Sequence, residues 1–243
     1  MFVSHAWKYA FYDVVVAAME QYASKDSDAY FWFDLFTNDQ NKVAEKDFNW
    51  FSDTFRNSIK NIGKVLLILS PWDDPMPIKR AWCLFEIYQA LEENSVEFTI
   101  DLPGSQNEEL KAAVTKDSRC VIRALSDIQA ENAQAAVNSD REMIFRVIQE
   151  SEGGFSKVNQ NVKRGLRSWY INQLQLLAQQ NPENERFLIN TGWVMKSFAF
   201  LDESLQYYTD LLSKRPADEQ EEESLAEIYN NMAIVYRDKG ELD

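Results

Sequence analysis

Lys64-Val-Leu-Leu-Ile-Leu-Ser-Pro-Trp72 and the nearby Arg80-Ala-Trp-Cys-Leu-Phe-Glu86 decide the fold of this chain. The unbroken apolar run Val65 to Leu69 predicts a strand that is buried on both faces, as parallel strands are. A helix is expected over Lys79 to Glu93, and it places the carboxylate of Glu86 just past that strand. Because α/β sheets bind ligands beyond the carboxyl ends of their strands, Glu86 is the first candidate functional residue.

Working outward, strand and helix patterns alternate through residues 1–150. The predicted strands are Phe2 to Ser4, Tyr30 to Phe33, Val65 to Leu69, Val96 to Ile100 and Cys120 to Ala124. The predicted helices are Tyr9 to Ala23, Phe48 to Ile59, Lys79 to Glu93, Glu108 to Thr115 and Asp140 to Glu150. Since parallel neighbours need a crossover connection, we predict an α/β domain with a flavodoxin-like five-stranded parallel sheet.

No strand pattern returns after residue 150. We therefore expect the α/β domain over 1–150, a helical connector over 151–184, and an all-α region of tetratricopeptide type over 185–243. The repeat pattern of small residues at helix contacts and bulky residues between them is carried by Leu188, Gly192, Met195, Ala199, Ser204, Tyr208, Leu211 and Pro216. It starts again at Tyr229, Met232, Ala233, Tyr236 and Gly240, after an interval longer than the usual period of about 34 residues. Such lengthened repeats resemble those of kinesin light chains, and we expect the array to be truncated here.

Composition excludes several classes of function. The net charge of −14 and the pI near 4.6 argue against a nucleic-acid binder and against an anionic membrane surface. Neither a membrane-spanning run nor a signal peptide is indicated, so a cytoplasmic protein is expected. Two cysteines, Cys83 and Cys120, with a single histidine make neither a disulfide framework nor an ordinary zinc site, and no metal or cofactor is expected.

Residues 1–150 resemble a Toll/interleukin-1 receptor (TIR) domain at three motifs. Phe2-Val-Ser-His-Ala-Trp7 resembles the first strand and loop of bacterial members, and Phe31-Trp-Phe-Asp34 resembles the second strand with its terminal Asp. Trp82-Cys-Leu-Phe-Glu86 resembles the W-C-L-x-E element of plant members. The Glu of that element is catalytic in the members that cleave NAD, so the resemblance implies Glu86 as the catalytic carboxylate and NAD as a substrate.

The implied reaction breaks the bond between nicotinamide and ribose. Glu86 would hold the ribose hydroxyls and stabilise the developing positive charge. The implied substrate-binding residues are Ser4, His5, Trp7, Asp34 and Trp82. The two tryptophans would stack on nicotinamide or adenine, Ser4 and His5 would hydrogen-bond phosphate or ribose, and Asp34 would line the edge.

Each candidate also has a structural interpretation. Trp82 fits the core of a helix facing a sheet, and Glu86 is close enough in sequence to pair with Arg80 or Lys79. His5 suits a hydrogen-bonded structural residue, and Asp34 suits a cap of the following loop.

Two main hypotheses for the whole protein remain open, and a third is an additional alternative. In the first, a TIR-type NAD hydrolase self-associates through its TIR-like domain and binds a protein or peptide partner through its repeat array. In the second, the same chain is a non-catalytic adaptor or scaffold. The third is a flavodoxin-shaped domain that binds a small molecule.

Overall fold

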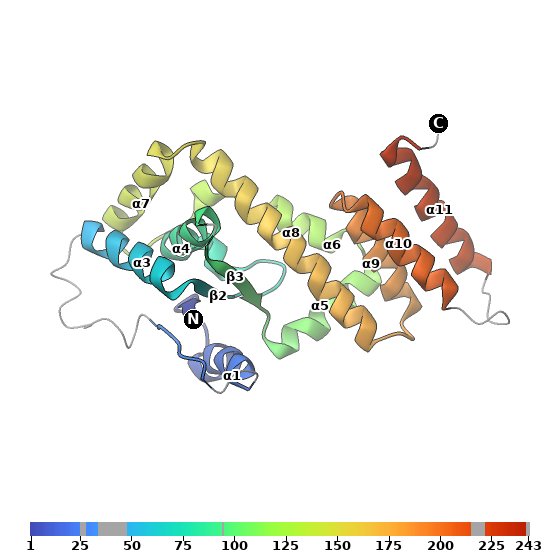
Figure 1. Cartoon of the computed structure of the whole chain (residues 1–243), viewed down its shortest axis with the longest axis horizontal. Coiled ribbons are helices and arrows are strands. Elements are labelled where there is room, and N and C mark those ends of the chain that lie inside the picture. The colour runs from blue at the N-terminus through green and yellow to red at the C-terminus, as the bar shows by residue number, and fades with distance from the viewer. Residues whose placement is uncertain (25–27, 34–47, 94, 215–221, 242–243) are drawn as a thin grey trace. The chain divides into compact units, whose positions relative to one another are not determined.

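The computed structural model of the chain describes residues 1–24, 28–33, 48–93, 95–214 and 222–241 (Figure 1). The chain divides into two compact units. The first comprises Met1–Gln106 and Asp127–Gly165, and the second comprises Asn107–Ser126 and Leu166–Asp243.

A parallel sheet forms the centre of the first unit. Its three strands in the described residues, in spatial order, are β1 (Phe2–Ser4), β2 (Lys64–Ile68) and β3 (Glu97–Asp101). Beyond β1, Trp32 forms an isolated parallel bridge with Phe2. β1 lies where the sequence predicted it, and the ends of β2 and β3 are each shifted by one residue.

The prediction of a flavodoxin-like five-stranded sheet was wrong, because the sheet has three strands in the described part of the chain. The segment predicted as the fifth strand is helix α6 (Cys120–Ser126). Its buried residues Val121, Ala124 and Leu125 are three and four positions apart, which is the spacing of one helix face. The segment Tyr30 to Phe33 contributes only the bridge at Trp32. Short apolar runs do not distinguish a strand from a buried helix, and the β-branched residues of the α6 segment favoured the wrong choice.

Helices surround the sheet of the first unit. They are the π-helix η1 (Phe11–Val16), α1 (Ala17–Ala23), α3 (Phe48–Ile62), the 3₁₀ helix η3 (Met76–Lys79), α4 (Ala81–Glu92), the 3₁₀ helix η4 (Ala130–Asn132), α7 (Asn138–Glu150) and the first part of α8 (Gly154–Gln180). One core cluster joins Val3 of β1 and Leu66 of β2 to Val15 and Ala18. Helix α4 is buried on nearly every side, since Leu84 and Phe85 are inaccessible to solvent and six further residues of the helix are also buried.

The second unit is helical throughout its described residues. It holds most of α5 (Gly104–Lys116), α6, the rest of α8, and α9 (Glu185–Ser197), α10 (Leu201–Ser213) and α11 (Glu222–Lys239). The side chain of Asn184 caps α9 by accepting a hydrogen bond from the Phe187 N–H at 3.1 Å. Ile189, Tyr208 and Ile228 form the core between α9, α10 and α11. Each of these helices therefore contributes one side chain to a common apolar contact.

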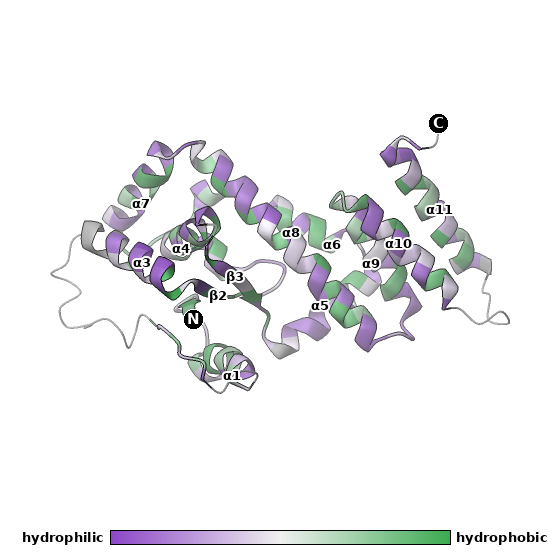
Figure 2. Cartoon of the chain, viewed as in Figure 1, coloured by the Kyte–Doolittle hydropathy of each residue, from purple (hydrophilic) through white to green (hydrophobic). Residues whose placement is uncertain are grey.

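Hydrophilic and hydrophobic residues alternate along most helices, as Figure 2 shows for α8. No helix in the described residues combines the length and the apolar character needed to cross a bilayer. The sequence likewise indicated no membrane-spanning run.

Candidate functional site

The end of β1 and helix α4 bring two candidate residues together. Ser4 is the last residue of β1, and its Oγ donates a hydrogen bond to Oε2 of Glu86 at 2.6 Å. Ser4 is completely buried and Glu86 is 7% exposed. The carboxylate therefore lies inside the first unit, and a hydroxyl group already occupies one of its oxygens.

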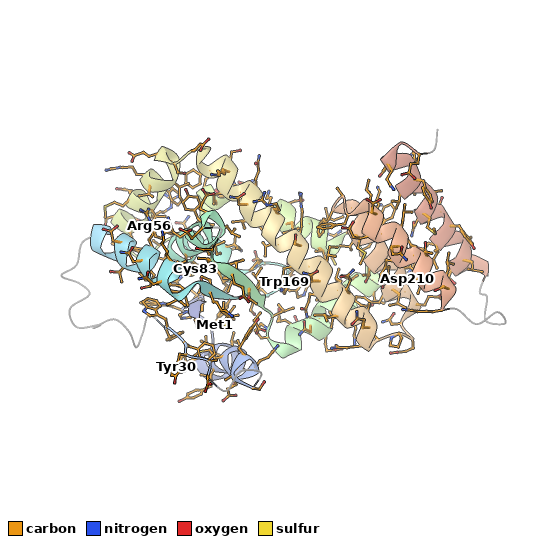
Figure 3. The ribbon with its side chains drawn as sticks, in the orientation of Figure 1. Met1, Tyr30, Arg56, Cys83, Trp169 and Asp210 are labelled. Atoms are coloured by element: carbon orange, nitrogen blue, oxygen red, sulfur yellow. The ribbon has the colours of Figure 1, made fainter. Side chains whose placement is uncertain are left out.

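A second hydrogen bond holds α4 against the chain that leaves β1. The thiol of Cys83, labelled in Figure 3, donates to the backbone oxygen of His5 at 3.1 Å. The ring of His5 stacks on Phe33 with 4.5 Å between centroids, and His5 is 6% exposed. His5 is thus packed into the core next to the Ser4–Glu86 pair, which agrees with the structural interpretation of this residue.

Trp82 lies one turn before Glu86 on α4, and its contacts run to other helices. Its Nε1 donates to Asp140 Oδ2 of α7 at 3.1 Å, and its ring lies 5.4 Å from that of Phe55 on α3. The hydrogen bond of Glu86 runs instead to β1. The indole is therefore an anchor that joins α4 to α3 and α7.

Of the two remaining predicted site residues, Trp7 lies at the surface and Asp34 is not among the described residues. Trp7 is 58% exposed, and the guanidinium carbon of Arg80 lies 5.8 Å from the centroid of its ring. This distance is near the limit for an attractive cation–π contact. Lys79, offered above as a partner of Glu86, pairs with Asp74 at 2.5 Å.

Sequence reasoning missed the role of Tyr9, which fixes the chain just after β2. Its hydroxyl donates to the Ser70 oxygen at 2.6 Å and accepts from the Ser70 N–H at 3.0 Å. Burial raises the pKa of Tyr9 well above its ordinary value, so the hydroxyl keeps its proton for these bonds. No local signal marks this role, because Ser70 is distant in sequence and Tyr9 fits the helix pattern that follows it.

The burial of Ser4 and Glu86 limits the chemistry that the two side chains can perform. A carboxylate beside a serine hydroxyl is able to take a proton or to hold a hydroxyl group. Both side chains here are screened from solvent, so in this conformation they bind each other. Among the described residues, no group of three or more His, Cys, Asp or Glu side chains is placed to hold a metal ion.

The second unit carries a solvent-facing hollow of about 500 Å³. Its lining residues are Gln175, Asp202, Glu203, Gln206, Tyr207 and Asp210. All but Gln175 belong to α10, on which Figure 3 labels Asp210. Asp202 also pairs with Lys239 of α11 at 2.7 Å. The sequence analysis did not single out these residues, and Asp202 and Glu203 in particular lie in the first turn of α10, where acidic side chains are common for dipole reasons alone.

Comparisons of the chain with protein-family models, with curated proteins and with solved structures found no match.

Proposed function

We propose that this chain is a non-catalytic adaptor, in which the α/β unit is a folded platform and the helical unit supplies the protein-binding surface. The observation that supports this proposal is the enclosure of Glu86, with 7% of its surface exposed and Oε2 held by Ser4. A carboxylate that binds ribose must offer its oxygens to the substrate hydroxyls. Here the completely buried Ser4 takes that place.

The surroundings of Glu86 support a structural role. Ser4 and Cys83 together make two hydrogen bonds between α4 and the exit of β1. A hydrogen bond to a charged group contributes about 1.5–3 kcal/mol to stability, so the Ser4–Glu86 bond is the stronger of the two, because a thiol is a weak donor. The pair therefore fixes how α4 packs on the sheet.

The helical unit supports the binding half of the proposal. The packing of α10 against α9 and α11 resembles the repeat pattern read from the sequence, with Gly192 and Tyr208 at the contact. Repeat arrays of this kind bind partners through an extended concave surface. A partner protein or peptide is thus expected on this unit.

NAD hydrolysis is the second candidate function, and it rests on the resemblance to TIR domains. One observation favours it: Glu86 lies beside Ser4 at the carboxyl end of a parallel strand, the place where α/β sheets bind ligands. The exposed Trp7 follows on the same segment. A movement that parts Ser4 from Glu86 would be needed before ribose could bind.

Release of nicotinamide from NAD by the wild-type chain and by Glu86→Gln, at high protein concentration, distinguishes the two functions. Thermal unfolding of both proteins is followed in parallel. The matched control is Glu142→Gln on α7, because Glu142 is exposed. The adaptor proposal expects no nicotinamide from any of the three and a lower melting temperature for Glu86→Gln alone. Wild-type turnover that disappears in a Glu86→Gln protein of unchanged melting temperature would overturn it.

A further inference from the structure

Arg80 lies between the 3₁₀ helix η3 and helix α4, and hydrogen bonds of the main chain fix its position. Its N–H donates to the Pro77 oxygen at 3.1 Å, and its own oxygen accepts from the Leu84 N–H at 2.9 Å. Arg80 also forms an isolated parallel bridge with Gln134, and both hydrogen bonds of that bridge measure 2.8 Å. The backbone from which the guanidinium extends is therefore held by the fold itself.

The guanidinium of Arg80 has no acceptor among the described residues. Its Nε is buried and has no hydrogen-bond partner, and no described carboxylate forms an ion pair with it, although the residue as a whole is partly exposed. Arg141 of α7 shows the usual arrangement, since it donates to the oxygens of Ala133 at 2.8 Å and Glu131 at 3.0 Å. A buried donor without a partner costs folding free energy and is rare in native proteins. Arg80 thus offers a ligand donors that the fold leaves unused.

Trp7 places an aromatic surface beside this guanidinium. The indole is 58% exposed, and its centroid lies 5.8 Å from the guanidinium carbon of Arg80. Trp7 follows β1 and Arg80 follows the loop after β2, so the two residues meet at the carboxyl edge of a parallel sheet, where α/β folds bind ligands. The hydrogen bond from Cys83 to the His5 oxygen holds the two segments together.

We propose that Arg80 and Trp7 bind a small monocarboxylate with an aromatic or apolar body. The carboxylate accepts two hydrogen bonds from the guanidinium, whose planar fork matches the spacing of two carboxylate oxygens. The body of the ligand packs against the indole of Trp7. This site goes beyond the adaptor function proposed above, and the buried Glu86 takes no part in it.

The charges around Arg80 favour a ligand with a single negative charge. Lys79, the neighbouring cation, is already paired with Asp74 at 2.5 Å, and Asp73 is exposed on the same loop. The whole chain carries a net charge of −14. One guanidinium balances one negative charge, whereas a phosphate monoester carries about 1.5–2 of them at neutral pH. A carboxylate therefore fits these surroundings better than a phosphate.

Saturation-transfer NMR titrations of the full chain with three related compounds test the choice of ligand. Phenylacetate is the monocarboxylate, phenylacetamide is its uncharged match, and phenyl phosphate carries the larger charge. Wild type is expected to bind phenylacetate about tenfold more tightly than either of the other two. Added salt should weaken the binding of phenylacetate, because the site is near the surface.

Substitutions test the two residues. Arg80→Gln should weaken phenylacetate binding about tenfold, and Arg80→Lys, which keeps the charge but not the planar fork, should recover only part of the loss. Trp7→Ala should also weaken binding, with little change in melting temperature, because the indole is exposed. The matched control is Arg56→Gln on α3, which removes an exposed arginine that bonds Gln89, and it should bind as wild type does.

Several outcomes would overturn the proposal. They are a wild type that binds none of the three compounds, equal binding of phenylacetate and phenylacetamide, tighter binding of phenyl phosphate, and a folded Arg80→Gln protein that binds as wild type does. Circular dichroism shows whether Arg80→Gln is folded. If it is not, Trp7→Ala decides, since unchanged affinity in that variant also overturns the proposal. Nicotinamide release measures the adaptor function separately, so a failure here is distinguishable from a failure there.

Discussion

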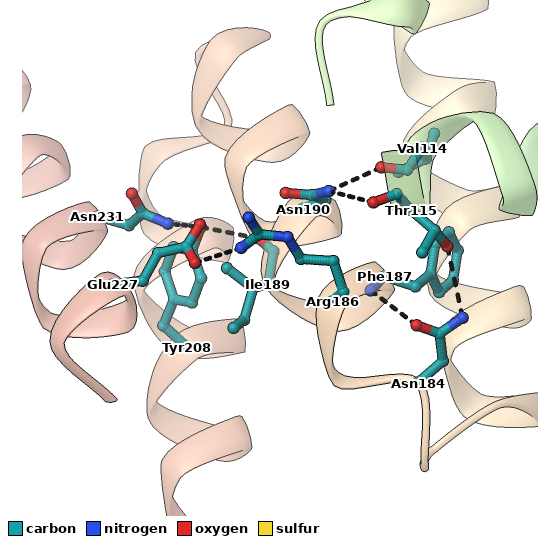
Figure 4. A network of polar contacts seen from close by, with 10 residues as sticks. All are labelled: Val114, Thr115, Asn184, Arg186, Phe187, Ile189, Asn190, Tyr208, Glu227 and Asn231. Atoms are coloured by element: carbon teal, nitrogen blue, oxygen red, sulfur yellow. Dashed lines mark hydrogen bonds and ion pairs between the residues drawn. The ribbon is translucent and has the colours of Figure 1, made fainter. Parts of the chain in front are cut away.

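The ring of Tyr208 on α10 fills the space next to Gly192 on α9, where a Cβ at Gly192 would lie only 2.5 Å from the Tyr208 Cζ. The ring is held in place from two sides (Figure 4). Its hydroxyl donates to the Ile189 oxygen at 3.1 Å and accepts from Asn231 Nδ2 at 3.2 Å. Gly192 lets α9 and α10 approach closely, and the hydroxyl of Tyr208 extends the same contact to α11.

Gly192→Ala is expected to destabilise the second unit. In an open helix the change would stabilise by up to about 1 kcal/mol, because alanine has the higher helix propensity. Here the new methyl group meets a ring fixed by two hydrogen bonds, and overpacking of this kind costs about 1–3 kcal/mol. Faster hydrogen exchange of the α9 and α10 amides is the expected readout.

The control is Gly165→Ala on α8, whose nearest atom is Leu91 Cδ2 at an ordinary contact distance of 3.8 Å. This variant should be neutral or slightly more stable, since its methyl group has room. If hydrogen exchange also becomes slower in Gly192→Ala than in wild type, then the ring of Tyr208 can shift, and its close contact with Gly192 does not constrain the packing of α9 on α10.

Ser4→Ala is expected to lower the free energy of unfolding by about 1–3 kcal/mol, because it removes the donor that Glu86 Oε2 uses inside the protein. Urea unfolding would measure the change. Ser126→Ala is the matched control, since Ser126 is exposed and bonds only within its own helix, to the Ile122 oxygen. The control should change by less than about 0.5 kcal/mol. Equal effects of the two substitutions would argue against a structural role for the Ser4–Glu86 bond.

Local patterns in the sequence predicted the elements that surround the site. The apolar run before Ser70 gave a buried strand, and the α4 pattern placed Glu86 on a helix that follows it. These features depend on the spacing of apolar residues and on the order of strands and helices along the chain, and both can be read from the sequence. Ser4 was expected to hydrogen-bond phosphate or ribose, whereas its hydroxyl donates to Glu86 in the structure.

Features that depend on distant partners were not predictable. The burial of Glu86 follows from what packs over α4, and helical spacing contains no information on that. The helix α6 was misread because Val121 and Ile122 favour a strand locally, whereas the packing of Val121 and Leu125 in the folded chain favours a helix. Tyr9 was read as part of a helix pattern, although its hydroxyl bonds Ser70. In each case tertiary contacts override the local preference.

Cys120 is expected to react slowly with iodoacetamide at neutral pH. Burial raises the pKa of its thiol to about 11, because burial disfavours the charged thiolate, and Asp117 acts in the same direction. The thiolate is the reactive form. The alkylation rate of the Cys120 peptide, measured by mass spectrometry, should therefore rise about tenfold per pH unit through pH 9 without levelling off. A free cysteine in solution is the reference, and a plateau for Cys120 near the ordinary thiol pKa of about 8.5 would contradict the expectation.

Asn190 closes the C-terminal end of α5 from the neighbouring helix α9. Its Nδ2 donates to the backbone oxygens of Val114 at 2.8 Å and Thr115 at 3.1 Å (Figure 4), and Asn190 is 9% exposed. The last carbonyls of a helix have no partner inside that helix and carry its negative dipole end. An amide donor from α9 therefore satisfies groups that burial would otherwise leave without a hydrogen bond.

Asn190→Ala should cost about 1–3 kcal/mol of unfolding free energy, because the two carbonyls lose this donor. Asn190→Asp should cost more, although the side chain keeps its shape. A carboxylate at this position replaces the donor by an acceptor and adds a negative charge at the negative end of α5, so it repels the carbonyls that the amide attracted. Urea unfolding at neutral pH is expected to rank wild type above Asn190→Ala and Asn190→Ala above Asn190→Asp. Lowering the pH until the new carboxylate is protonated should bring the two variants closer together in stability, since a protonated acid again offers one donor. An Asn190→Asp protein that is as stable as wild type at neutral pH would show that the Asn190 amide does not hold the end of α5.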